Sequence, residues 1–594
     1  MGNEAIALGA MRAGLRLAAG YPGTPSTEIL ETVAKNNHGS IHVEWSINEK
    51  AALEVAAGAA YSGARALVTM KQMGLNVAAD PLMSLAYVGV KGGLVVVAAD
   101  DPGPISSQTE QDTRHFAQFA KLPVFDPVSP EEAYLMIADA FAASEKYGLP
   151  VLLRPTTRVC HGCASIELLP DLLVPQPEGF VRDPGKWVIF PRLSYRNHLK
   201  LEADLPLIGA ELSALPYNRI EGNDKAGRGV ALSGISYAYA REIPDLDDMR
   251  ILKIGTPHPF PERLARQFLD GLDEVLVLEE LDPVVERALL QLAGQYHLPV
   301  KIHGKLSNNT QNAGENSVES IRADLDRFLG RAAPAAALLD DRPALPERPP
   351  VLCPGCPHRA SFLAVKQAAR GKKAVFCGDI GCYTLGNTLP LDMVDTCLCM
   401  GAGVTVAQGV ERINPHTLSF AFIGDSTFFA SGITGVANAV YNQSEMILIV
   451  LDNATTAMTG HQPHPGTGRN MMGQNAAPLR IEKILRALGV DFVEQADSLD
   501  LPAAVDTVKR AIAASGVRCV IFESPCVMMD KTAGKKYAVS AACTGCDACI
   551  KLLGCPALIR KAEAAFIEPA LCKGCGLCAG ICPQKAILEV QADE

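Results

Sequence analysis

Two polar motifs follow two apolar segments in the second half of the chain. Residues 418–423 are followed by Asp425 in a Gly-Asp-Ser turn, and residues 446–451 are followed by Asn453 in an Asp-Asn pair. Short apolar runs of this kind are typical of buried parallel strands. In a strand–helix–strand unit both strands end at the same edge of the sheet, where α/β folds bind ligands. We therefore expect Asp425 and Asn453 to lie close together.

These residue types suit a magnesium ion that holds a diphosphate group. Mg2+ prefers hard oxygen ligands and is commonly shared between carboxylates and phosphate oxygens. We expect the protein's ligands to be the Asp425 carboxylate, the Asn453 amide oxygen and a backbone carbonyl near Thr455. The helix that opens after the first motif, at Gly424 and Ser426, offers free N–H groups to the phosphates.

A second kind of chemistry is indicated by cysteines near the end of the chain. Two runs of the form Cys-x2-Cys-x2-Cys are each closed by a Cys-Pro pair, and the second has the spacing of bacterial ferredoxins. The first has a longer final gap. In two-cluster ferredoxins the last cysteine of each run binds the other cluster. We therefore expect one [4Fe-4S] cluster on Cys543, Cys546, Cys549 and Cys582, and another on Cys572, Cys575, Cys578 and Cys555.

A zinc ribbon is the alternative for this segment, because zinc sites also use Cys-x2-Cys pairs. Two sets of three evenly spaced cysteines with Cys-Pro fit that alternative poorly. Other cysteines follow no pattern, and free cysteine often behaves as a small buried hydrophobic side chain. We expect such a structural role for Cys160, Cys163, Cys377, Cys397, Cys399 and Cys519.

The elements that must position these residues belong to several α/β domains, because short apolar segments alternate with helical stretches. The expected parts are α/β domains at 1–165, 228–330 and 351–530, a Pro-punctuated connecting segment at 166–227, a Pro/Ala linker at 331–350 and a cysteine-rich domain at 531–594. Strands are expected at 66–69, 94–98, 151–153, 230–232, 251–254, 274–278 and 300–303, and helical residues at 3–19 and 47–66.

Composition limits the class of protein. The 594 residues are 48% hydrophobic and 20% charged, as in globular proteins of several domains. No apolar run reaches about 18 residues, and the first residues lack the features of a secretory signal. The net charge of −11 argues against nucleic-acid binding. We expect a cytoplasmic enzyme, and for its 18 cysteines we expect metal sites rather than disulfides as the main use.

Three residues of the first domain are candidates for catalytic roles, and the start of a later helix is a candidate for cofactor binding. Thr24 lies in the turn GYPGTPSTE, Glu49 begins a helix, and Arg114 lies in a polar loop. The alternatives are a simple turn for Thr24, a helix cap for Glu49 and a solvated loop charge for Arg114. Met400 and Gly401 open a glycine-containing helix suited to approach a cofactor.

The whole chain resembles the 2-oxo acid ferredoxin oxidoreductases, and among them the large (alpha) subunits that act on indolepyruvate. The resemblance rests on the segments GNEAIALGAMRAG, GYPGTPSTEI, INEKAALEVAAGAAYSGARA, CPGCPHR, GDSTFF and DNATTAMTGHQ. It implies a pyrimidine-type thiamine diphosphate (TPP) domain at 1–165, a transketolase C-terminal-like domain at 228–330, a diphosphate-type TPP domain at 351–530 and a two-cluster ferredoxin-like domain at 531–594.

The resemblance also implies roles for single residues. The cofactor would be TPP, with Mg2+ on the ligands named above. Glu49 matches a glutamate that hydrogen-bonds the aminopyrimidine ring, and Thr24 matches a threonine near the substrate carboxylate or keto oxygen. Arg114 sits where relatives have a substrate-binding arginine, in a looser local match.

The resemblance also implies a third [4Fe-4S] cluster, because similar CPGC, GC and PCV segments hold a cluster close to TPP in relatives. Two clusters are nevertheless usual in chains like this one. Its ligands would be Cys353, Cys356, Cys382 and Cys526. From the residues alone, Cys356 and Cys382 form a metal-binding pair and Cys526 is a buried thiol.

The implied reaction is the oxidative decarboxylation of aryl pyruvates, indolepyruvate first, with coenzyme A to aryl-acetyl-CoA and CO2. Electrons would pass through the clusters to ferredoxin, because no Gly-x-Gly-x-x-Gly segment follows an expected strand. A small beta subunit, in an α2β2 assembly, is the expected partner. The alternatives are the same chemistry on pyruvate or 2-oxoglutarate, a non-oxidative 2-oxo acid decarboxylase, and a pure electron carrier.

Overall fold

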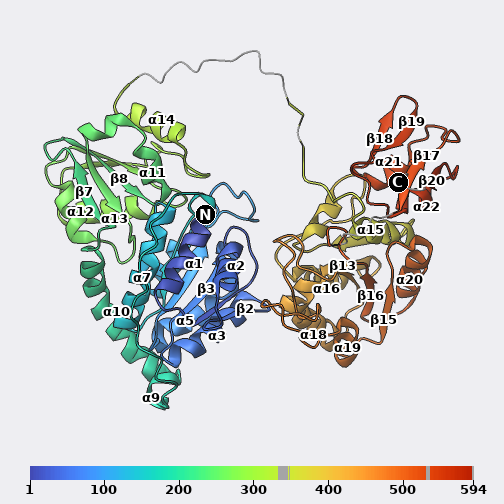
Figure 1. Cartoon of the computed structure of the whole chain (residues 1–594), viewed down its shortest axis with the longest axis horizontal. Helices are drawn as coiled ribbons and strands as arrows, with labels where there is room; N and C mark the ends of the chain where they lie inside the picture. Colours follow the sequence, from blue (N-terminus) through green and yellow to red (C-terminus); the bar gives the residue numbers. More distant parts are fainter. Residues whose placement is uncertain (332–344, 347, 530–534, 591–594) are drawn as a thin grey trace. The chain divides into compact units, whose positions relative to one another are not determined.

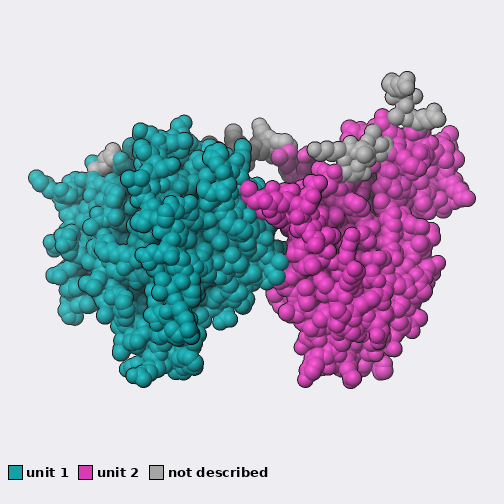
Figure 2. Space-filling view, turned by 60° about the horizontal axis from the view of Figure 1, so that its bottom comes forward, with its two compact units in different colours: residues 1–342 teal, residues 343–594 magenta. Residues whose placement is uncertain are grey.

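The computed structural model describes residues 1–331, 345–346, 348–529 and 535–590. The chain forms two compact units, residues 1–342 (unit 1) and 343–594 (unit 2), drawn as a cartoon in Figure 1 and in separate colours in Figure 2. The boundary between the units falls inside the predicted linker 331–350, and residues 332–344 and 347 of that linker lie outside the described residues.

Unit 1 begins with a six-stranded parallel sheet of order β2-β1-β3-β4-β6-β5. The strands are β1 (Leu17–Gly20), β2 (His42–Trp45), β3 (Ala66–Lys71), β4 (Leu94–Ala99), β5 (Val124–Phe125) and β6 (Val151–Leu153). All residues of β4 and β6 are buried, as expected for central parallel strands with both faces covered. The blue and cyan elements of Figure 1 form this sheet and its helices, among them α1 (Gly2–Arg12) and α7 (Pro130–Tyr147).

The helical segment expected at residues 3–19 is shorter than predicted. Helix α1 ends at Arg12, and Gly14 then adopts a left-handed conformation with φ +75°. A left-handed residue stops a helix, and glycine adopts this conformation without strain. The chain can therefore turn into β1, whose apolar residues the sequence analysis assigned to the helix.

A second sheet of unit 1 has the order β11-β10-β8-β9-β7. Its strands are β7 (Arg219–Gly222), β8 (Arg228–Ser233), β9 (Arg250–Ile254), β10 (Glu274–Leu278) and β11 (Lys301–His303). The strands predicted here are all present, but β7 was not expected and pairs antiparallel with β9 at the edge. The connecting segment 166–227 therefore supplies one strand of this sheet. It also contains the 22-residue helix α10 (Pro191–Leu212), which packs against α5 (Ala79–Val88) and α12 (Glu262–Leu269).

Unit 2 is built on a five-stranded parallel sheet of order β12-β13-β14-β16-β15. The strands are β12 (Ala374–Cys377), β13 (Leu418–Gly424), β14 (Ile447–Asp452), β15 (Phe492–Ala496) and β16 (Arg518–Glu523). One face packs on α15 (Pro357–Ala368) and α20 (Leu501–Ala513), and the other on α16 (Ala402–Ile413), α18 (Ile433–Tyr441) and α19 (Ile481–Ala487). Alternate strand residues enter the two cores: Phe420 and Phe422 face α15, whereas Ala421 and Ile423 face α16.

The cysteine-rich tail consists of two short antiparallel pairs and two short helices. These are β17 (Lys536–Val539) with β20 (Ile587–Val590), β18 (Leu558–Lys561) with β19 (Ala564–Ile567), α21 (Ala548–Leu553) and α22 (Leu577–Ile581). Its buried side chains, such as Leu558 and Leu577, share one hydrophobic core with Phe362 of α15. The tail is thus packed onto the domain of the five-stranded sheet within unit 2. Among the described residues, no helix has the length and apolar character needed to cross a membrane.

Candidate active site and cysteine sites

The carboxyl ends of two neighbouring strands bring the predicted magnesium ligands together. Strand β13 pairs in parallel with both β12 and β14, so the residues after these strands share one edge of the sheet. Asp425 follows β13, and Asn453 follows β14; they are 3% and 7% exposed. The Thr456 hydroxyl donates to the Ser426 hydroxyl across 3.0 Å and joins the two motifs. The structure therefore assembles both motifs into one site.

The Asp425 carboxylate has a second acid and a histidine beside it. Its Oδ1 accepts from the Ser426 backbone N–H at 2.8 Å, and its Oδ2 lies 3.1 Å from Nε2 of buried His464. Burial, together with the neighbouring Asp425, raises the pKa of Asp452 to about 7. Two acids held this close favour a cation between or beside them. Carboxylate oxygens are among the hard ligands that Mg2+ prefers.

The loop after β14 leaves one polar atom without a partner. Ala454 is left-handed (φ +59°), and the Asn453 side-chain oxygen accepts from the Thr455 backbone N–H at 3.3 Å. The Thr455 hydroxyl is buried and has no hydrogen-bond partner in the described part of the chain. Buried polar atoms are rarely left unpaired, so this orphan hydroxyl fits a site that a phosphate or a hydrated ion completes. The Asn453 amide also lies 3.4 Å from Nε2 of His358.

Met400 and Gly401 lie at the start of α16, and a buried acid holds this turn in place. Gly401 is left-handed (φ +85°), and its N–H donates to Asp379 Oδ1 at 2.8 Å. The Ser431 hydroxyl donates to the Met400 carbonyl, and a Cβ at Gly401 would lie only 2.4 Å from Ser431 Oγ. Burial raises the pKa of Asp379 to about 7. Only glycine fits here without displacing its neighbour.

Glu49 is the first residue of helix α3 (Glu49–Tyr61) in unit 1 and is 8% exposed. The side chain of Asn48 caps this helix by accepting from the Ala51 backbone N–H at 2.9 Å. Capping therefore does not explain the buried Glu49 carboxyl. Burial raises its pKa, although its own backbone N–H and Lys71 partly offset the effect. Gly74 allows close contact, since a Cβ there would lie 2.6 Å from Glu49 Oε1.

Thr24 lies at the carboxyl edge of the six-stranded sheet of unit 1, in the turn between β1 and α2 (Thr27–Asn36). Its side chain is half-buried. Its carbonyl accepts from the Ser106 hydroxyl at 3.3 Å. Lys71, at the end of β3, adjoins this turn because a Cβ at Gly23 would lie 3.3 Å from Lys71 Cγ. Burial lowers the pKa of Lys71, and the nearby Glu49 and Asp101 carboxylates act against this shift. The structure thus places Thr24, Glu49 and the unpredicted Lys71 in one region.

Arg114 is placed differently from either expectation. Its side chain is fully buried, so a solvated loop charge is wrong. The guanidinium is paired with Asp112 at 2.6 Å and Glu279 at 2.8 Å, and it donates to the carbonyls of Glu280 and Asp282. Burial lowers the pKa of Arg114, but these two carboxylates more than offset it, and the pKa is raised. With its donors committed, Arg114 joins the first domain to the second sheet, and the geometry gives no support to a substrate-binding role.

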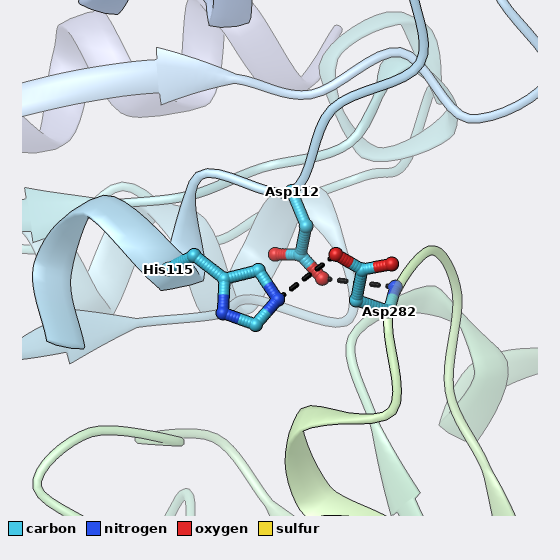
Figure 3. Close-up of side chains that lie close together, drawn as sticks. All are labelled: Asp112, His115 and Asp282. Carbon is cyan, nitrogen blue, oxygen red and sulfur yellow. Dashed lines mark hydrogen bonds and ion pairs between the residues drawn. The ribbon is translucent and has the colours of Figure 1, made fainter. Parts of the chain in front are cut away.

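Three side chains near Arg114 come close enough to hold a metal ion (Figure 3). His115 Nε2 lies 2.9 Å from Asp282 Oδ2, and Asp112 Oδ2 accepts from the Asp282 backbone N–H at 3.1 Å. The Asp112 carboxylate is already neutralised by Arg114, however, and Asp282 is exposed. This arrangement is accounted for by hydrogen bonds and ion pairs between the two domains of unit 1.

The second predicted cluster set borders one cavity, which lies between the tail and residues 354–359. Its lining contains the four cysteines Cys555, Cys572, Cys575 and Cys578. Burial and the three neighbouring thiols raise the pKa of Cys578 to about 12. The structure therefore brings Cys555 to the opposite run of cysteines, in the crossed arrangement that the ferredoxin spacing predicts.

The other tail set is brought together in part. Burial, and less strongly the thiols of Cys582 and Cys543, raise the pKa of Cys549. The Ala586 backbone N–H donates to Cys582 Sγ at 3.3 Å, a type of contact that tunes cluster sulfurs. Cys546 is exposed.

The four cysteines of the third set also neighbour one another. Burial, then the thiols of Cys353 and Cys382, raise the pKa of Cys356 to about 12. Burial, then Cys353 and Cys526, raise the pKa of Cys382 to about 11. The Cys526 backbone N–H donates to the Asn453 carbonyl at 3.0 Å, so this set lies beside the loop after β14.

The cysteines outside the three sets divide into two groups. Cys160, Cys377 and Cys519 are buried, in agreement with a structural role. The expectation of a buried thiol is wrong for Cys163, Cys397 and Cys399, which are exposed. Periodicity could not reveal this, because all three lie outside regular strands and helices.

Three family models match the chain. The thiamine diphosphate-binding domain of pyruvate flavodoxin/ferredoxin oxidoreductases matches residues 8–183, and the C-terminal TPP-binding domain of thiamine pyrophosphate enzymes matches residues 379–522. A 4Fe-4S binding domain matches residues 565–588. The fold and these domains define the class of TPP-dependent 2-oxo acid oxidoreductases, and the predicted fold class is confirmed.

Full-length relatives identify the family. Indolepyruvate oxidoreductase subunit IorA of Methanothermobacter thermautotrophicus is 42% identical, over 99% of this chain and 96% of the relative. The protein of the same name from Thermococcus kodakarensis is 40% identical, over 100% and 97%. The chain belongs to the family of IorA subunits of indolepyruvate oxidoreductase, and the predicted resemblance is thereby confirmed.

More distant proteins match only part of the chain. The 2-oxoglutarate synthase subunit KorA of Archaeoglobus fulgidus is 26% identical over 47% of this chain and 86% of its own. A solved 2-oxoglutarate:ferredoxin oxidoreductase from Magnetococcus marinus is 18% identical over 51% of this chain and 61% of its own. Its TM-score of 0.41 is too low to support an argument.

Proposed function

We propose that the chain is the TPP-binding subunit of an enzyme that oxidatively decarboxylates aryl pyruvates, indolepyruvate first, with coenzyme A to aryl-acetyl-CoA and CO2. Electrons leave through [4Fe-4S] clusters to ferredoxin. One observation carries this proposal. The loop that holds Asn453 is hydrogen-bonded to Cys526 of the third cysteine set, which supports a decarboxylation site and an electron acceptor that adjoin within unit 2.

Residues of unit 2 would hold the diphosphate end of the cofactor. The magnesium ligands would be Asp425, Asn453 and the backbone carbonyl of Thr455, and the orphan Thr455 hydroxyl supports a polar ligand there. The cofactor itself would contact the turns at Gly424, Ser426, Met400 and Gly401. When bound, TPP supplies an electron sink for loss of CO2 from a 2-oxo acid.

Residues of unit 1 would act on the aminopyrimidine end and on the substrate. Because burial raises the pKa of Glu49, its carboxyl keeps a proton to a higher pH than an exposed glutamate, and it can donate this proton in a hydrogen bond. The half-buried Thr24 hydroxyl would bind the substrate carboxylate or keto oxygen, with the Lys71 ammonium nearby. Arg114 is not part of this proposal, because its donors are already committed.

The cysteines would hold three clusters, two in the tail and one beside the Asn453 loop. Each cluster accepts one electron at a time, so several clusters allow the electron pair released by decarboxylation to leave stepwise. The relatives are named as subunits, which supports a partner chain. We propose a small beta subunit in an α2β2 assembly, with coenzyme A and ferredoxin as the further reactants.

The cofactor assignment can be tested with Asp425→Asn. Loss of a hard anionic ligand should weaken magnesium-dependent TPP binding more than tenfold in calorimetry, with iron content unchanged. Asp491→Asn is the matched control, because Asp491 is exposed in the same unit. Equal TPP affinity in Asp425→Asn and the native chain would refute the magnesium site.

A further inference from the structure

Arg359 is a buried cation without an acidic partner. It lies in α15 and is 4% exposed. Its Nη2 donates to the Leu352 carbonyl at 2.8 Å, and its Nη1 donates to the Leu553 carbonyl. Within the described residues, Arg359 forms no ion pair, and its buried Nε has no hydrogen-bond partner. A buried charge is unfavourable unless an opposite charge compensates it.

The position of Arg359 suggests where the compensating charge lies. Leu352 immediately precedes Cys353 of the third set, and Leu553 lies two residues before Cys555 of the second tail set. The guanidinium therefore links the backbones that carry both sets. Arg359 also lines the cavity enclosed by the second tail set, together with Cys356 of the third set.

The two cysteine sets are in direct contact through their loops. Gly355, between Cys353 and Cys356, is left-handed (φ +75°), and a Cβ there would lie 2.8 Å from Lys573 Cβ. Lys573 in turn lies between Cys572 and Cys575. A glycine at this position thus allows the loop of the third set to pack against the loop of the second tail set, next to Arg359.

We propose that Arg359 is the shared counter-cation of two iron–sulfur clusters, one on the third set and one on the second tail set, and that its charge raises the reduction potential of both. The inference rests on the proposed function, which assigns clusters to these cysteines. A cluster gains one negative charge when it takes up one electron, and a nearby cation stabilises that reduced state. As an electron passes between the two clusters, one is oxidised and the other reduced, and Arg359 stabilises the electron at either position.

The test is a redox titration of the full chain after anaerobic reconstitution of the clusters. Electron paramagnetic resonance monitors the reduction of each cluster during the titration. Arg359→Gln removes the charge, Arg359→Lys keeps it, and Arg370→Gln is the control because Arg370 is exposed just after the same helix. We expect Arg359→Gln to weaken reduction of both clusters about tenfold, which is about 59 mV for a one-electron couple, and a shift confined to one cluster would refute the shared role. Arg359→Lys should stay close to the native potentials, and Arg370→Gln should match them.

Arg359→Gln with full iron content and native potentials would overturn the proposal. If Arg359→Gln loses iron, the result for Arg359→Lys decides between the explanations. Native iron content and native potentials in Arg359→Lys would support a role of the positive charge. An equal loss of iron in Arg359→Gln and Arg359→Lys would refute that role. Native iron equal to two clusters rather than three would remove the third cluster from the proposed function. The effect of Arg359 on the second tail set would still be measurable, so the two failures are distinguishable.

Discussion

Glu49 is a buried residue for which a structural role as a helix cap can be distinguished from a chemical role. Asn48 already caps α3, and Gly74 leaves room for the Glu49 carboxyl, so the fold maintains a buried acid that the helix does not need. We predict that Glu49→Gln lowers turnover by about 10²–10⁴-fold, the usual range for loss of a positioned acid or base. Iron content and TPP affinity should change little. Steady-state kinetics with iron analysis measure this effect.

Glu54→Gln is the control for Glu49→Gln, because Glu54 lies exposed on the same helix in a surface pair with Lys50. It should keep native turnover. Native turnover in Glu49→Gln itself would show that the buried carboxyl has no chemical role.

Arg114 gives the opposite case, a residue that the sequence links to the substrate and the structure links to the fold. Removing one partner of a buried ion pair typically destabilises a protein by about 3–5 kcal/mol. We predict that Arg114→Met lowers the thermal midpoint of unit 1 clearly, because Asp112 and Glu279 lose their buried counter-charge. Differential scanning calorimetry measures this.

The control is Arg158→Met, since the Arg158–Glu315 pair also links the two domains of unit 1 but is partly exposed. Such surface pairs contribute about 0–1 kcal/mol. A raised KM for the 2-oxo acid with an unchanged thermal midpoint in Arg114→Met would instead restore the substrate-binding role.

Some site residues could be predicted from the sequence and others could not. Asp425 and Asn453 were recognisable because each directly follows an apolar strand. Asp379 also follows a strand, β12, but its Gly-Asp-Ile-Gly context is common in turns. His464 and Arg359 carry no local signal, since their roles depend on contacts with Asp425 and with two distant carbonyls that only the folded chain assembles.

At the scale of elements, the short helix α4 (Gln72–Val77) positions Glu49 through Gly74. A methyl group at Gly74 would overlap the Glu49 carboxyl, so we predict that Gly74→Ala displaces this side chain and lowers turnover at least tenfold. The overlap involves the end of a flexible side chain, and the fold should therefore survive. Kinetics together with circular dichroism measure both effects.

Gly58→Ala is the matched control for Gly74→Ala, because Gly58 lies in α3 and nothing approaches its added Cβ. Alanine stabilises a helix interior relative to glycine by about 0.5–1 kcal/mol, so this variant should be active and slightly more stable. Equal turnover in both variants would mean that α4 does not constrain Glu49.

Element boundaries were predicted where apolar runs were buried on both faces, as in β4, β13 and β14. They were missed where a local break decided the structure: a left-handed Gly14 ends α1 early, and β7 is a half-buried edge strand without an apolar run. Edge strands bury less, so their hydrophobic pattern is weaker.

At the scale of the whole molecule, the two TPP-binding regions and the iron–sulfur region could be predicted because each carries its own motif. The packing between the domains could not be predicted from the sequence. The sharing of one core by the ferredoxin-like tail and α15, and the burial of Arg359 between two cysteine sets, depend on surfaces that no motif encodes. These contacts join the proposed decarboxylation site to its electron acceptors within unit 2.

The most direct test of the central claim is an anaerobic assay of the chain with the proposed small subunit, in which viologen reduction by indolepyruvate is followed. Phenylpyruvate, pyruvate and 2-oxoglutarate are compared under the same conditions. We predict dye reduction that requires both TPP and coenzyme A and is fastest with the aryl substrates. Release of CO2 without dye reduction would contradict the account and identify a non-oxidative decarboxylase, and activity with the small acids alone would contradict the proposed substrate.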